Sequence, residues 1–510
     1  MATEGGRRWL TLVIVVDVLV VFVGLGVSVY AVAQVPGENL ASAAFSFAFF
    51  LANVFFGFFS LNYAMNYWHS RLSYRAPPTS GLTGPRSASV ALLVPIYNEP
   101  FAMVENNLEA ARLAAGNDAR LYVLDDSTSE DGPRIRELAE SMGAIYRHRE
   151  RRRGYKAGAI NDALEEISEE YVAVLDIDQM PSPGFLRRVV PILDADPRVG
   201  FVQLPQEYAN TDASLLARLT AAQQFIFYQI LTEGKSVEGT LFSCGTNVVY
   251  RRSALASAGN FDESSIVEDI ATSTRMAAAG WKGVYLNEPL VYGRAPVTME
   301  GYINQQWRWA RGTVGLLPRV VRNLVLSGTL GWRARFDWLA TVGWYLYGWF
   351  YLPFLLAPIL MILGVQVLLI PEWLYFVAWL PYGVVVLGLF AMTQIRRGGS
   401  PSTVYLNLAA NLIMFPVSIS ATVSALARRR RPFTTARTGG RLPWYRFWPQ
   451  FAVMASIAVS LPFLILRGGW FGFVTAFWAV FQLGLFLPIF WLNRQPRPAL
   501  IDAPAGRLAA

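Results

Sequence analysis

The chain has 510 residues, of which 54% are hydrophobic and only 16% are charged, a composition too apolar for an average soluble protein. Its single cysteine, Cys244, excludes an intramolecular disulfide. Its 2 histidines are too few for a zinc cage or a histidine-driven hydrolytic site, so a bound metal would need oxygen ligands. The formal net charge of +8 comes largely from arginines beside apolar runs, which argues for a membrane surface and against a nucleic-acid partner.

The chain begins with two apolar runs, residues 10–33 and 41–65, each longer than the roughly 20 residues that span a bilayer. Two arginines precede the first run, and the loop between the runs, residues 34–40, contains no lysine or arginine. Because basic residues favour the cytosolic side, residues 1–66 are predicted to form a transmembrane hairpin with both ends in the cytosol. The domain that follows is then expected to be cytosolic.

Residues 67–331 have a different character, because charged residues are dispersed among β-branched runs with helical patterns between them. The predicted strands include residues 89–94, 120–124 and 171–175. Alternating strands and helices predict a mostly parallel, Rossmann-like α/β sheet, whose ligand sites lie at the carboxyl ends of the strands. Two amphipathic stretches, residues 214–231 and 302–326, are predicted to lie at the membrane interface, although an ordinary core helix explains the first equally well.

The chain becomes apolar again after residue 331, so residues 332–496 are predicted to form a second membrane region. The expected spans there are residues 337–364, 368–392, 447–466 and 470–492. Residues 403–427 are also apolar, but arginines flank both ends, so this stretch is assigned as interfacial or re-entrant, leaving six spans in all. Residues 497–510 are expected to form a short cytosolic tail.

Acidic residues follow two of the predicted strands. Asp125 and Asp126 end one strand, and Asp176 and Asp178 follow another. Acids at the end of a buried strand repel one another, so they usually face a cation or a basic group. An Asp-x-Asp pair can hold Mg²⁺ or Mn²⁺, and such a metal can bridge the phosphates of a nucleotide diphosphate. Solvated turn acids would explain either pair alone, but two acid-tipped strands in one sheet favour a ligand site.

Other short motifs suggest contacts to a nucleotide and a sugar. Tyr97 and Glu99 follow the first strand, where they can hold a nucleobase and a ribose, or merely form a turn. Lys156 has glycines on both sides at the start of a helical pattern, which suits a phosphate or sugar contact. Glu268 and Asp269 precede another helical run, where a carboxylate can act as general base toward an acceptor hydroxyl, or simply cap the helix.

A further motif combines Gln305, Arg308 and Trp309, which are spaced i, i+3 and i+4 and therefore share one helical face. Arg308 can neutralise a diphosphate leaving group, and Trp309 can stack on a sugar ring. The aromatic-rich residues 344–351 can line a polysaccharide channel, although helix packing or interfacial anchoring explains them equally well.

These motifs, in this order and spacing, resemble the processive family 2 glycosyltransferases of the cellulose synthase and hyaluronan synthase type, over nearly the whole chain. The resemblance implies a GT-A-type glycosyltransferase domain inserted into an α-helical transmembrane bundle. It also implies the following site residues: Asp125, Asp126, Asp176, Gln305, Arg308 and Trp309 for nucleotide and substrate, Asp178 and Asp176 for the metal, Asp269 as catalytic base beside Glu268, and Cys244, Gly245, Thr246 and Trp309 for the acceptor. From their own positions in the sequence, Tyr97, Glu99 and Lys156 are added to the nucleotide and substrate residues.

Three features depart from the family pattern. Val267 stands where the family has threonine, which removes a capping hydroxyl but leaves the acids in place. Residues 428–441 resemble the family's mobile gating loop, with Phe433, Thr435 and Arg437 as its expected residues, but the motif is a residue short and has arginine for lysine. The sequence after residue 492 is expected to be too short for the cyclic-di-GMP-binding domain of bacterial cellulose synthases.

The sequence therefore predicts a multi-pass protein of the plasma (inner) membrane with a cytoplasmic catalytic domain. The expected reaction is processive, inverting transfer from a UDP-sugar, UDP-glucose first, to a growing β-linked polysaccharide that is moved across the membrane. Mg²⁺ or Mn²⁺ is the expected cofactor, and accessory export subunits are candidate partners. The alternatives are a non-processive transferase that makes a glycolipid, a synthase that uses UDP-N-acetylglucosamine, and a catalytically silent subunit that binds or transports nucleotide or glycan.

Overall fold

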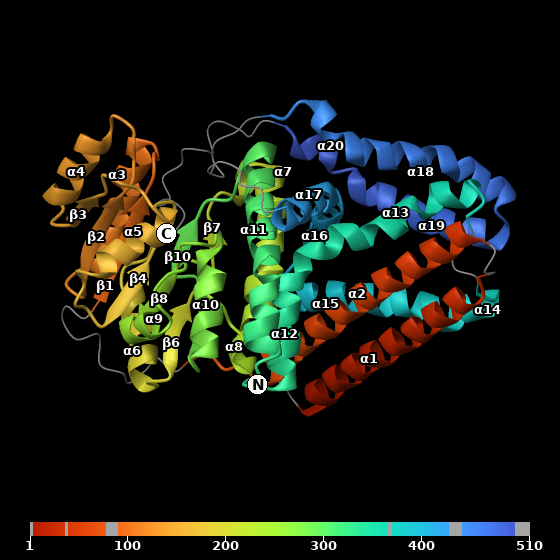
Figure 1. Ribbon diagram of the computed structural model, residues 1–510, viewed down its shortest axis with the longest axis horizontal. Helices are drawn as coiled ribbons and strands as arrows, with labels where there is room; N and C mark the ends of the chain where they lie inside the picture. The colour runs from red at the N-terminus through yellow and green to blue at the C-terminus, as the bar shows by residue number, and fades with distance from the viewer. Residues whose placement is uncertain (1–3, 36–38, 78–89, 366–369, 428–440, 495–510) are drawn as a thin grey trace.

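The computed structural model describes residues 4–35, 39–77, 90–365, 370–427 and 441–494. The gating-like residues Phe433, Thr435 and Arg437 and the expected tail, residues 497–510, lie outside the described residues. Figure 1 shows a sheet-containing domain at one end of the molecule and a bundle of long helices at the other. The upright helices α7 (Leu215–Ile226) and α11 (Met299–Val320) stand between these two parts (Figure 1).

The domain is built on a seven-stranded mixed sheet with strand order β3-β2-β1-β4-β8-β6-β9. The strands are β1 (Val90–Ile96), β2 (Ala119–Asp125), β3 (Ile145–His148), β4 (Tyr171–Val174), β6 (Val199–Gln203), β8 (Val248–Arg251) and β9 (Lys282–Tyr285). Neighbouring strands pair in parallel except at β8, which is antiparallel to both β4 and β6. A three-stranded sheet, in the order β5-β10-β7, lies beside it and comprises β5 (Met180–Pro181), β7 (Glu207–Tyr208) and β10 (Val291–Gly293).

Helices cover both faces of the large sheet, which explains why its central strands are apolar on both sides. In β1, Val90, Leu92 and Val94 pack on one face and Ala91 and Leu93 on the other, all buried. The helices of the domain are α3 (Phe101–Ala115), α4 (Gly132–Ser141), α5 (Tyr155–Leu164), α6 (Phe185–Ala195), α8 (Thr232–Glu238), α9 (Arg252–Ser257) and α10 (Glu268–Ala278). Each fully buried leucine stabilises the fold by roughly 1.5–3 kcal/mol.

The strand order places a topological switch point between β1 and β4, because the chain passes from β1 to β2 on one side and later reaches β4 on the other. At this edge the carboxyl ends of β1, β2 and β4 meet the amino end of the antiparallel β8. The predicted sheet is thus confirmed as α/β and mostly parallel. Its antiparallel strand adds residues 244–247, which directly precede β8, to the edge where ligands bind in such sheets.

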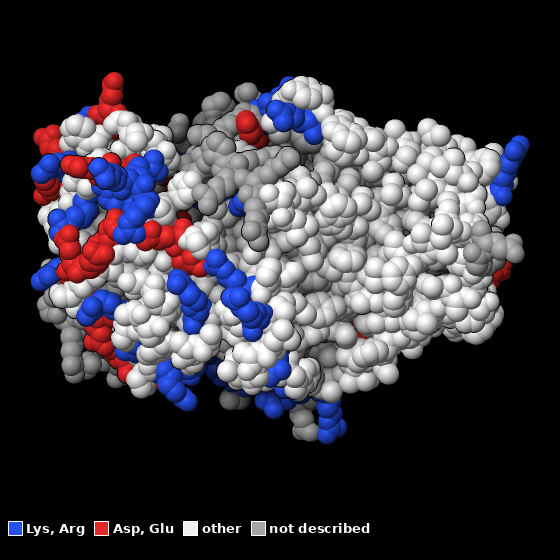
Figure 2. All heavy atoms as spheres, in the orientation of Figure 1, with Lys and Arg blue, Asp and Glu red and all other residues white. Residues whose placement is uncertain are grey.

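The other end of the molecule is a bundle of long apolar helices, and Figure 2 shows it almost free of charged side chains on the face in view. Its helices are α1 (Glu4–Ala33), α2 (Leu40–Leu72), α12 (Trp332–Gly343), α13 (Tyr347–Ile362), α14 (Glu372–Leu374), α15 (Leu380–Arg396), α16 (Pro401–Ile413), α17 (Phe415–Leu426), α18 (Trp448–Arg467), α19 (Gly469–Phe486) and α20 (Ile489–Leu492). Short 3₁₀ or π-helical turns join α12 to α13 and α14 to α15. Helices of this length and apolarity suit a bilayer.

Six helical stretches in the described part of the chain are long and apolar enough to cross a membrane, as the sequence predicted. They are Arg7–Ala33, Leu40–Leu72, Trp332–Ile362, Glu372–Arg396, Trp444–Arg467 and Gly469–Leu492. Residues 403–427, assigned above as interfacial or re-entrant, lie in α16 and α17, which are bent by 46° at the break between them. They would form a seventh span only if both helices are counted together. α17 packs along α11, and Asn407 of α16 donates to the Ala222 carbonyl of α7 at 2.9 Å. These contacts favour the interfacial or re-entrant interpretation.

Candidate active site

Asp269 lies in the first turn of α10, at the ligand-binding edge of the sheet. Its Oδ1 accepts a hydrogen bond from the backbone N–H of Ile270 at 2.8 Å. A Cβ added to Gly245 would stand 3.2 Å from the Asp269 Oδ2 atom, so this glycine, whose φ is +77°, faces the carboxylate. Burial, and secondly the charge of Glu268, raise the pKa of Asp269 to about 7. A carboxylate with such a pKa is suited to accept a proton near neutral pH.

Lys156 connects this carboxylate to the acids at the end of β4. Its Nζ donates to the Gly245 carbonyl at 2.7 Å and forms an ion pair with Asp176. Burial lowers the pKa of Lys156, but the charges of Asp176 and Glu268 outweigh it, so the net shift is upward and the ammonium stays charged. Burial of Glu268 raises the pKa of its carboxyl, and the positive charges of Lys156 and Arg308 partly offset this rise. One ammonium therefore serves a cluster of three acids.

The segment of residues 240–246, which runs into β8, supplies the backbone of the site. Thr246 Oγ1 accepts from the Asp176 N–H at 2.8 Å, and Ser243 N donates to Ser273 Oγ at 2.9 Å. The Cys244 N–H donates to Gln203 Oε1 at 2.8 Å. Burial raises the pKa of the Cys244 thiol to about 12, so it stays protonated. The structure thus brings the predicted acceptor residues Cys244, Gly245 and Thr246 together with the predicted base.

The predicted metal ligands Asp176 and Asp178 lie in the turn after β4 and are both partly exposed. Gln179 Nε2 donates to Asp178 Oδ1 at 3.3 Å. Within the described ranges, no group of three or more His, Cys, Asp or Glu side chains could hold a metal by itself. Mg²⁺ keeps several waters and binds through one or two carboxylates plus substrate phosphates, so a pair of accessible aspartates fits such an ion once a diphosphate is bound.

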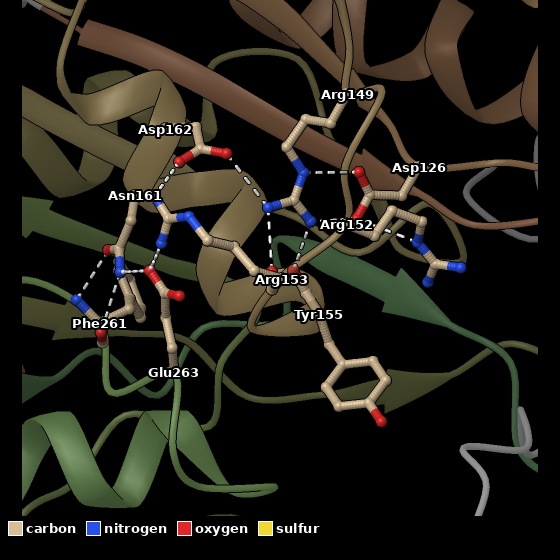
Figure 3. A network of polar contacts seen from close by, with 9 residues as sticks. All are labelled: Asp126, Arg149, Arg152, Arg153, Tyr155, Asn161, Asp162, Phe261 and Glu263. Carbon is tan, nitrogen blue, oxygen red and sulfur yellow. Dashed lines mark hydrogen bonds and ion pairs between the residues drawn. The ribbon is translucent and has the colours of Figure 1, made fainter.

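The acids at the end of β2 face basic and hydroxyl groups, as expected for acids at a buried strand end. Asp126 pairs with Arg149, whose Nε lies 2.8 Å from Oδ1, and Arg152 Nε lies 3.8 Å from Oδ2 (Figure 3). Asp125 accepts from Tyr146 Oη and from the Ser127 N–H, each at 2.8 Å. Both carboxylates are buried, so their described contacts fix the local structure first and leave a nucleotide role as a prediction.

The turn after β1 places Tyr97 and Glu99 beside the β2 acids. Asn98 has a φ of +57°, and its Oδ1 accepts from the N–H groups of Thr128 and Ser129, which ties the two turns together. Glu99 Oε2 accepts from the Tyr97 N–H at 2.5 Å. The Arg152 guanidinium lies 3.9 Å from the centre of the Tyr97 ring. A base that stacks on this face of Tyr97 must therefore share it with, or displace, Arg152.

Figure 3 shows a polar network that the sequence motifs did not reveal. Arg149 Nη1 donates to Asp162 at 3.2 Å and to the Arg153 carbonyl at 3.0 Å, while Arg153 pairs with Asp162 and Glu263. Asn161 Nδ2 donates to the Phe261 carbonyl and to Glu263. The network therefore anchors α5, which carries Lys156, to the loop before Asp269. In the sequence, the run of arginines at residues 151–153 indicates a charged segment but not which acids it pairs with.

The helix α11 carries the predicted Gln305, Arg308 and Trp309. Its Gly312 packs against Val267 just before α10, since a Cβ on this glycine would stand 2.6 Å from a Val267 methyl. Arg308 acts electrostatically on Glu268, which joins α11 to the carboxylate cluster. Gln305 Oε1 is buried and accepts no hydrogen bond from the described part of the chain. The three side chains are partly buried, so substrate can still reach them.

Comparison with known proteins places this arrangement. Residues 171–392 match the family model described as glycosyl transferase family group 2. Cellulose synthase 2 from Novacetimonas hansenii is 27% identical over 390 residues, 74% of this chain and 24% of that protein. A probable glucomannan 4-beta-mannosyltransferase 3 from Oryza sativa subsp. japonica is 32% identical over 252 residues, 47% of this chain and 45% of that protein. The chain thus spans less than half the length of these relatives.

The fold also matches a solved structure, a mannosyltransferase from Pyrobaculum calidifontis in complex with GDP-Man and Mn²⁺. The TM-score is 0.51, with 21% identity, over 76% of this chain and 99% of that one. The sheet order, the family match and this structural likeness agree on a GT-A-type domain. The chain therefore carries a glycosyl transferase family group 2 region at residues 171–392, beside helices long and apolar enough to cross a membrane, and it is similar in sequence to cellulose synthases and glucomannan mannosyltransferases.

Proposed function

We propose that this chain polymerises a β-linked polysaccharide from a nucleotide-sugar by processive, inverting transfer, with UDP-glucose as the first candidate donor. The observation that carries the proposal is the position of Asp269. Its carboxylate faces Gly245, whose carbonyl binds Lys156, which in turn pairs with Asp176. A general base, a buried cation and the acids that suit a diphosphate-bound metal therefore meet at one edge of the sheet.

In the proposed reaction, Asp269 accepts the proton of an acceptor hydroxyl while the oxygen of that hydroxyl attacks the anomeric carbon of the donor sugar. The bond from that carbon to the nucleoside diphosphate breaks on the opposite face, so configuration inverts and an α-linked donor gives a β-linked product. The ammonium of Lys156 and the guanidinium of Arg308 stabilise the charge on the departing diphosphate. Mg²⁺ or Mn²⁺, held by Asp178 with Asp176 and the diphosphate oxygens, would supply further charge neutralisation there.

Glu268, Asp125, Asp126, Tyr97 and Glu99 complete the proposed site. Glu268 tunes the pKa of its neighbour Asp269. The β2 acids and the residues of the adjoining turn are proposed to line the nucleoside site. Asp126 would act there through Arg149, with which it pairs, and Tyr97 through Arg152, which lies over its ring. Gln305 and Trp309 on α11 are proposed to hold the acceptor end of the glycan. Within the described residues the buried Gln305 Oε1 has no hydrogen-bond partner, which supports this, because a sugar hydroxyl is a suitable donor for it.

The distribution of charge supports a cytosolic orientation of the domain in the plasma (inner) membrane. Basic residues cluster at the helix ends nearest the domain: Arg8, Arg71, Arg75, Arg333, Arg335, Arg396, Arg397 and Arg494. At the opposite ends of the spans, Arg467 is the one basic residue within the described ranges. Basic residues favour the cytosolic side, where nucleotide-sugars are made. A polymer made there and needed outside would cross through the helical bundle, with accessory subunits as candidate partners.

A donor other than UDP-glucose has its own support. The relatives include both cellulose synthases and glucomannan 4-beta-mannosyltransferases, so GDP-mannose is the second candidate. UDP-N-acetylglucosamine stays the third. A non-processive transferase that makes a glycolipid would give a product of one or a few sugars on a lipid, and a catalytically silent subunit would release no nucleotide.

The test is to purify the full chain in nanodiscs and to supply each nucleotide-sugar separately with Mg²⁺ or Mn²⁺. Release of nucleoside diphosphate, product length and digestion by linkage-specific hydrolases are then measured. The proposal expects a β-glycan of many units from one preferred donor. A short glycolipid product would support the non-processive alternative instead. No release of nucleoside diphosphate from any donor would contradict the proposal.

A further inference from the structure

The junction between the domain and the membrane helices contains a cluster of buried charges that the proposed mechanism does not use. Lys235 of α8 and Asp337 of α12 form an ion pair of 2.6 Å, and their side chains are 5% and 0% exposed. Burying two charges is costly unless both are fully hydrogen-bonded, and a pair of apolar residues is often no less stable. A pair of this kind therefore invites a role beyond stability.

The Asp337 carboxylate is saturated with donors from three separate elements. Its Oδ1 accepts from Asn62 and Asn66 of α2, each at 2.9 Å. Its Oδ2 accepts from Lys235 and from the Thr240 hydroxyl. Thr240 is wholly buried and begins the segment of residues 240–246. One membrane-helix carboxylate thus holds the start of the segment that supplies the backbone of the active site.

Farther along, the segment reaches residues of the site. Ser243 N donates to Ser273 Oγ, which donates to the Asp269 carbonyl at 2.7 Å. The Gly245 carbonyl accepts from Lys156. The segment is therefore fixed at one end to Asp337 and, six residues later, to Asp176 through Thr246 Oγ1.

α8 is held against the membrane helices at close range. A Cβ added to Gly234 would stand 2.5 Å from the backbone oxygen of Asn66, so α8 rests directly on α2. Next to this glycine, Glu233 pairs with Arg397 and accepts from Ser70. This second ion pair joins the same two parts of the molecule, but the side-chain hydrogen bonds described for Glu233, Arg397 and Ser70 do not reach residues 240–246. It therefore offers a matched control.

We propose that Asp337, Lys235 and Thr240 are positioning residues, which fix residues 240–246 from the membrane side and thereby set Gly245 and Lys156 against Asp269. The inference rests on the proposed transferase function and deepens it, because it makes the membrane helix α12 part of the apparatus that aligns the site. A misplacement of about 1 Å at a reacting centre can cost roughly a hundredfold in rate, so a buried anchor at this point is functionally demanding.

The test compares full-length variants in nanodiscs by kcat and KM for the donor that the parent uses, together with thermal unfolding. Thr240→Val removes the hydroxyl that binds Asp337 without changing side-chain size, and Thr240→Ser keeps it. We expect Thr240→Val to lower kcat roughly tenfold or more, with the Tm close to that of the parent and activity restored in Thr240→Ser. Thr232→Val removes an equally buried hydroxyl, which donates to the Tyr228 carbonyl, and should leave kcat unchanged.

Variants of the two ion pairs, Lys235–Asp337 and Glu233–Arg397, distinguish a positioning role from a general loosening of the junction. Asp337→Asn is expected to lower kcat by more than its loss of thermal stability explains. Glu233→Gln, in contrast, is expected to lower Tm with kcat retained. Parental kcat in Thr240→Val, or equal losses of kcat in Asp337→Asn and Glu233→Gln at equal Tm, would overturn the proposal. An inactive parent would instead count against the transferase function, and the two failures are thus distinguished.

Discussion

The carbonyl oxygen of Gly245 accepts a hydrogen bond from Lys156 Nζ at 2.7 Å, and the same glycine faces the Asp269 carboxylate. Gly245 has a φ of +77°, which a residue with a side chain rarely adopts, and a side chain there would also crowd Asp269. This one backbone position therefore sets the distance between the cation proposed to serve the diphosphate and the base proposed to serve the acceptor.

Replacing Asp269 by Asn should abolish transfer while leaving the site able to bind nucleoside diphosphate. Loss of a general base costs about 10²–10⁴-fold in kcat. Because the folded pKa of this carboxyl is raised, the ionised form destabilises the folded protein at pH 8, so the Tm of Asp269→Asn should be no lower than that of the parent. Full activity of this variant would refute the assignment, and Asp131→Asn, on the surface, is the control.

The pH dependence of kcat/KM should show an acidic limb near pH 7, because Asp269 must be deprotonated to act and its pKa is raised to about 7. Below that pH, activity should fall about tenfold for each further unit. Glu268→Gln removes a neighbouring negative charge that raises this pKa, so the limb should move to lower pH. Glu288→Gln, at the remote ion pair with Arg188, should not move it. A limb that stays in place in Glu268→Gln would contradict the proposed coupling.

Gly154→Ala should destabilise the domain more than Gly143→Ala. Both glycines have positive φ, +62° and +73°, so each substitution costs about 1–2 kcal/mol of backbone strain. A Cβ at Gly154 would also stand 2.6 Å from Glu263, whereas one at Gly143 meets nothing within 4 Å. Overpacking adds roughly 1–3 kcal/mol at Gly154. Urea unfolding of the two variants measures the difference, and equal losses would show that Glu263 moves away freely.

Removal of divalent metal by a chelator should abolish transfer, and Mg²⁺ or Mn²⁺ should restore it. Asp178→Asn weakens an oxygen ligand, so the metal concentration that gives half-maximal activity should rise by about tenfold or more. The titration of activity with metal measures this directly. Asp212→Asn, outside the strand ends, is the control. Unchanged metal dependence in Asp178→Asn would exclude this residue as a ligand.

A reporter placed at Gly399 should lie in the cytosol and one at Gly469 outside, because the basic helix ends are expected on the cytosolic side. Gly399 follows Arg396 and Arg397, and Gly469 follows the end of α18. Modification of membrane-intact cells by an impermeant reagent distinguishes the sides. The reverse labelling pattern would invert the proposed orientation and move the catalytic domain away from its donor.

Sequence reasoning recovered the features that local patterns encode. β2 was predicted at residues 120–124 and spans Ala119–Asp125, because apolar β-branched runs between turn residues mark buried strands. The same reasoning placed acids at strand ends and expected basic partners, and Asp126 has one in Arg149. Periodicity carries no strand direction, however, and the antiparallel β8 was not predicted.

Contacts between distant parts of the chain were beyond local patterns. Asp337 is the first residue of a predicted span, and its partner Lys235 lies 102 residues away in the sequence. Nothing in the local sequence of either residue indicates that the two pair. The contact of the Arg152 guanidinium with the Tyr97 ring is a similar case, because the local sequence around Arg152 indicates only a basic turn. Asp17 and Asn53 are polar residues within the predicted spans 10–33 and 41–65, where each needs a hydrogen-bond partner. Asp17 accepts from Ser60, and Asn53 donates to the Phe49 carbonyl, so the two do not pair with each other.

The most direct test of the central claim is a polymerisation assay on the full chain in nanodiscs, with radiolabelled UDP-glucose and Mg²⁺ or Mn²⁺, run beside Asp269→Asn. The account predicts nucleoside diphosphate release matched by a long, alkali-stable β-glucan from the parent and neither product from the variant. Equal product from parent and variant would contradict the assignment of Asp269. A parent that releases no nucleoside diphosphate from UDP-glucose, nor from GDP-mannose or UDP-N-acetylglucosamine supplied in its place, would contradict the function itself.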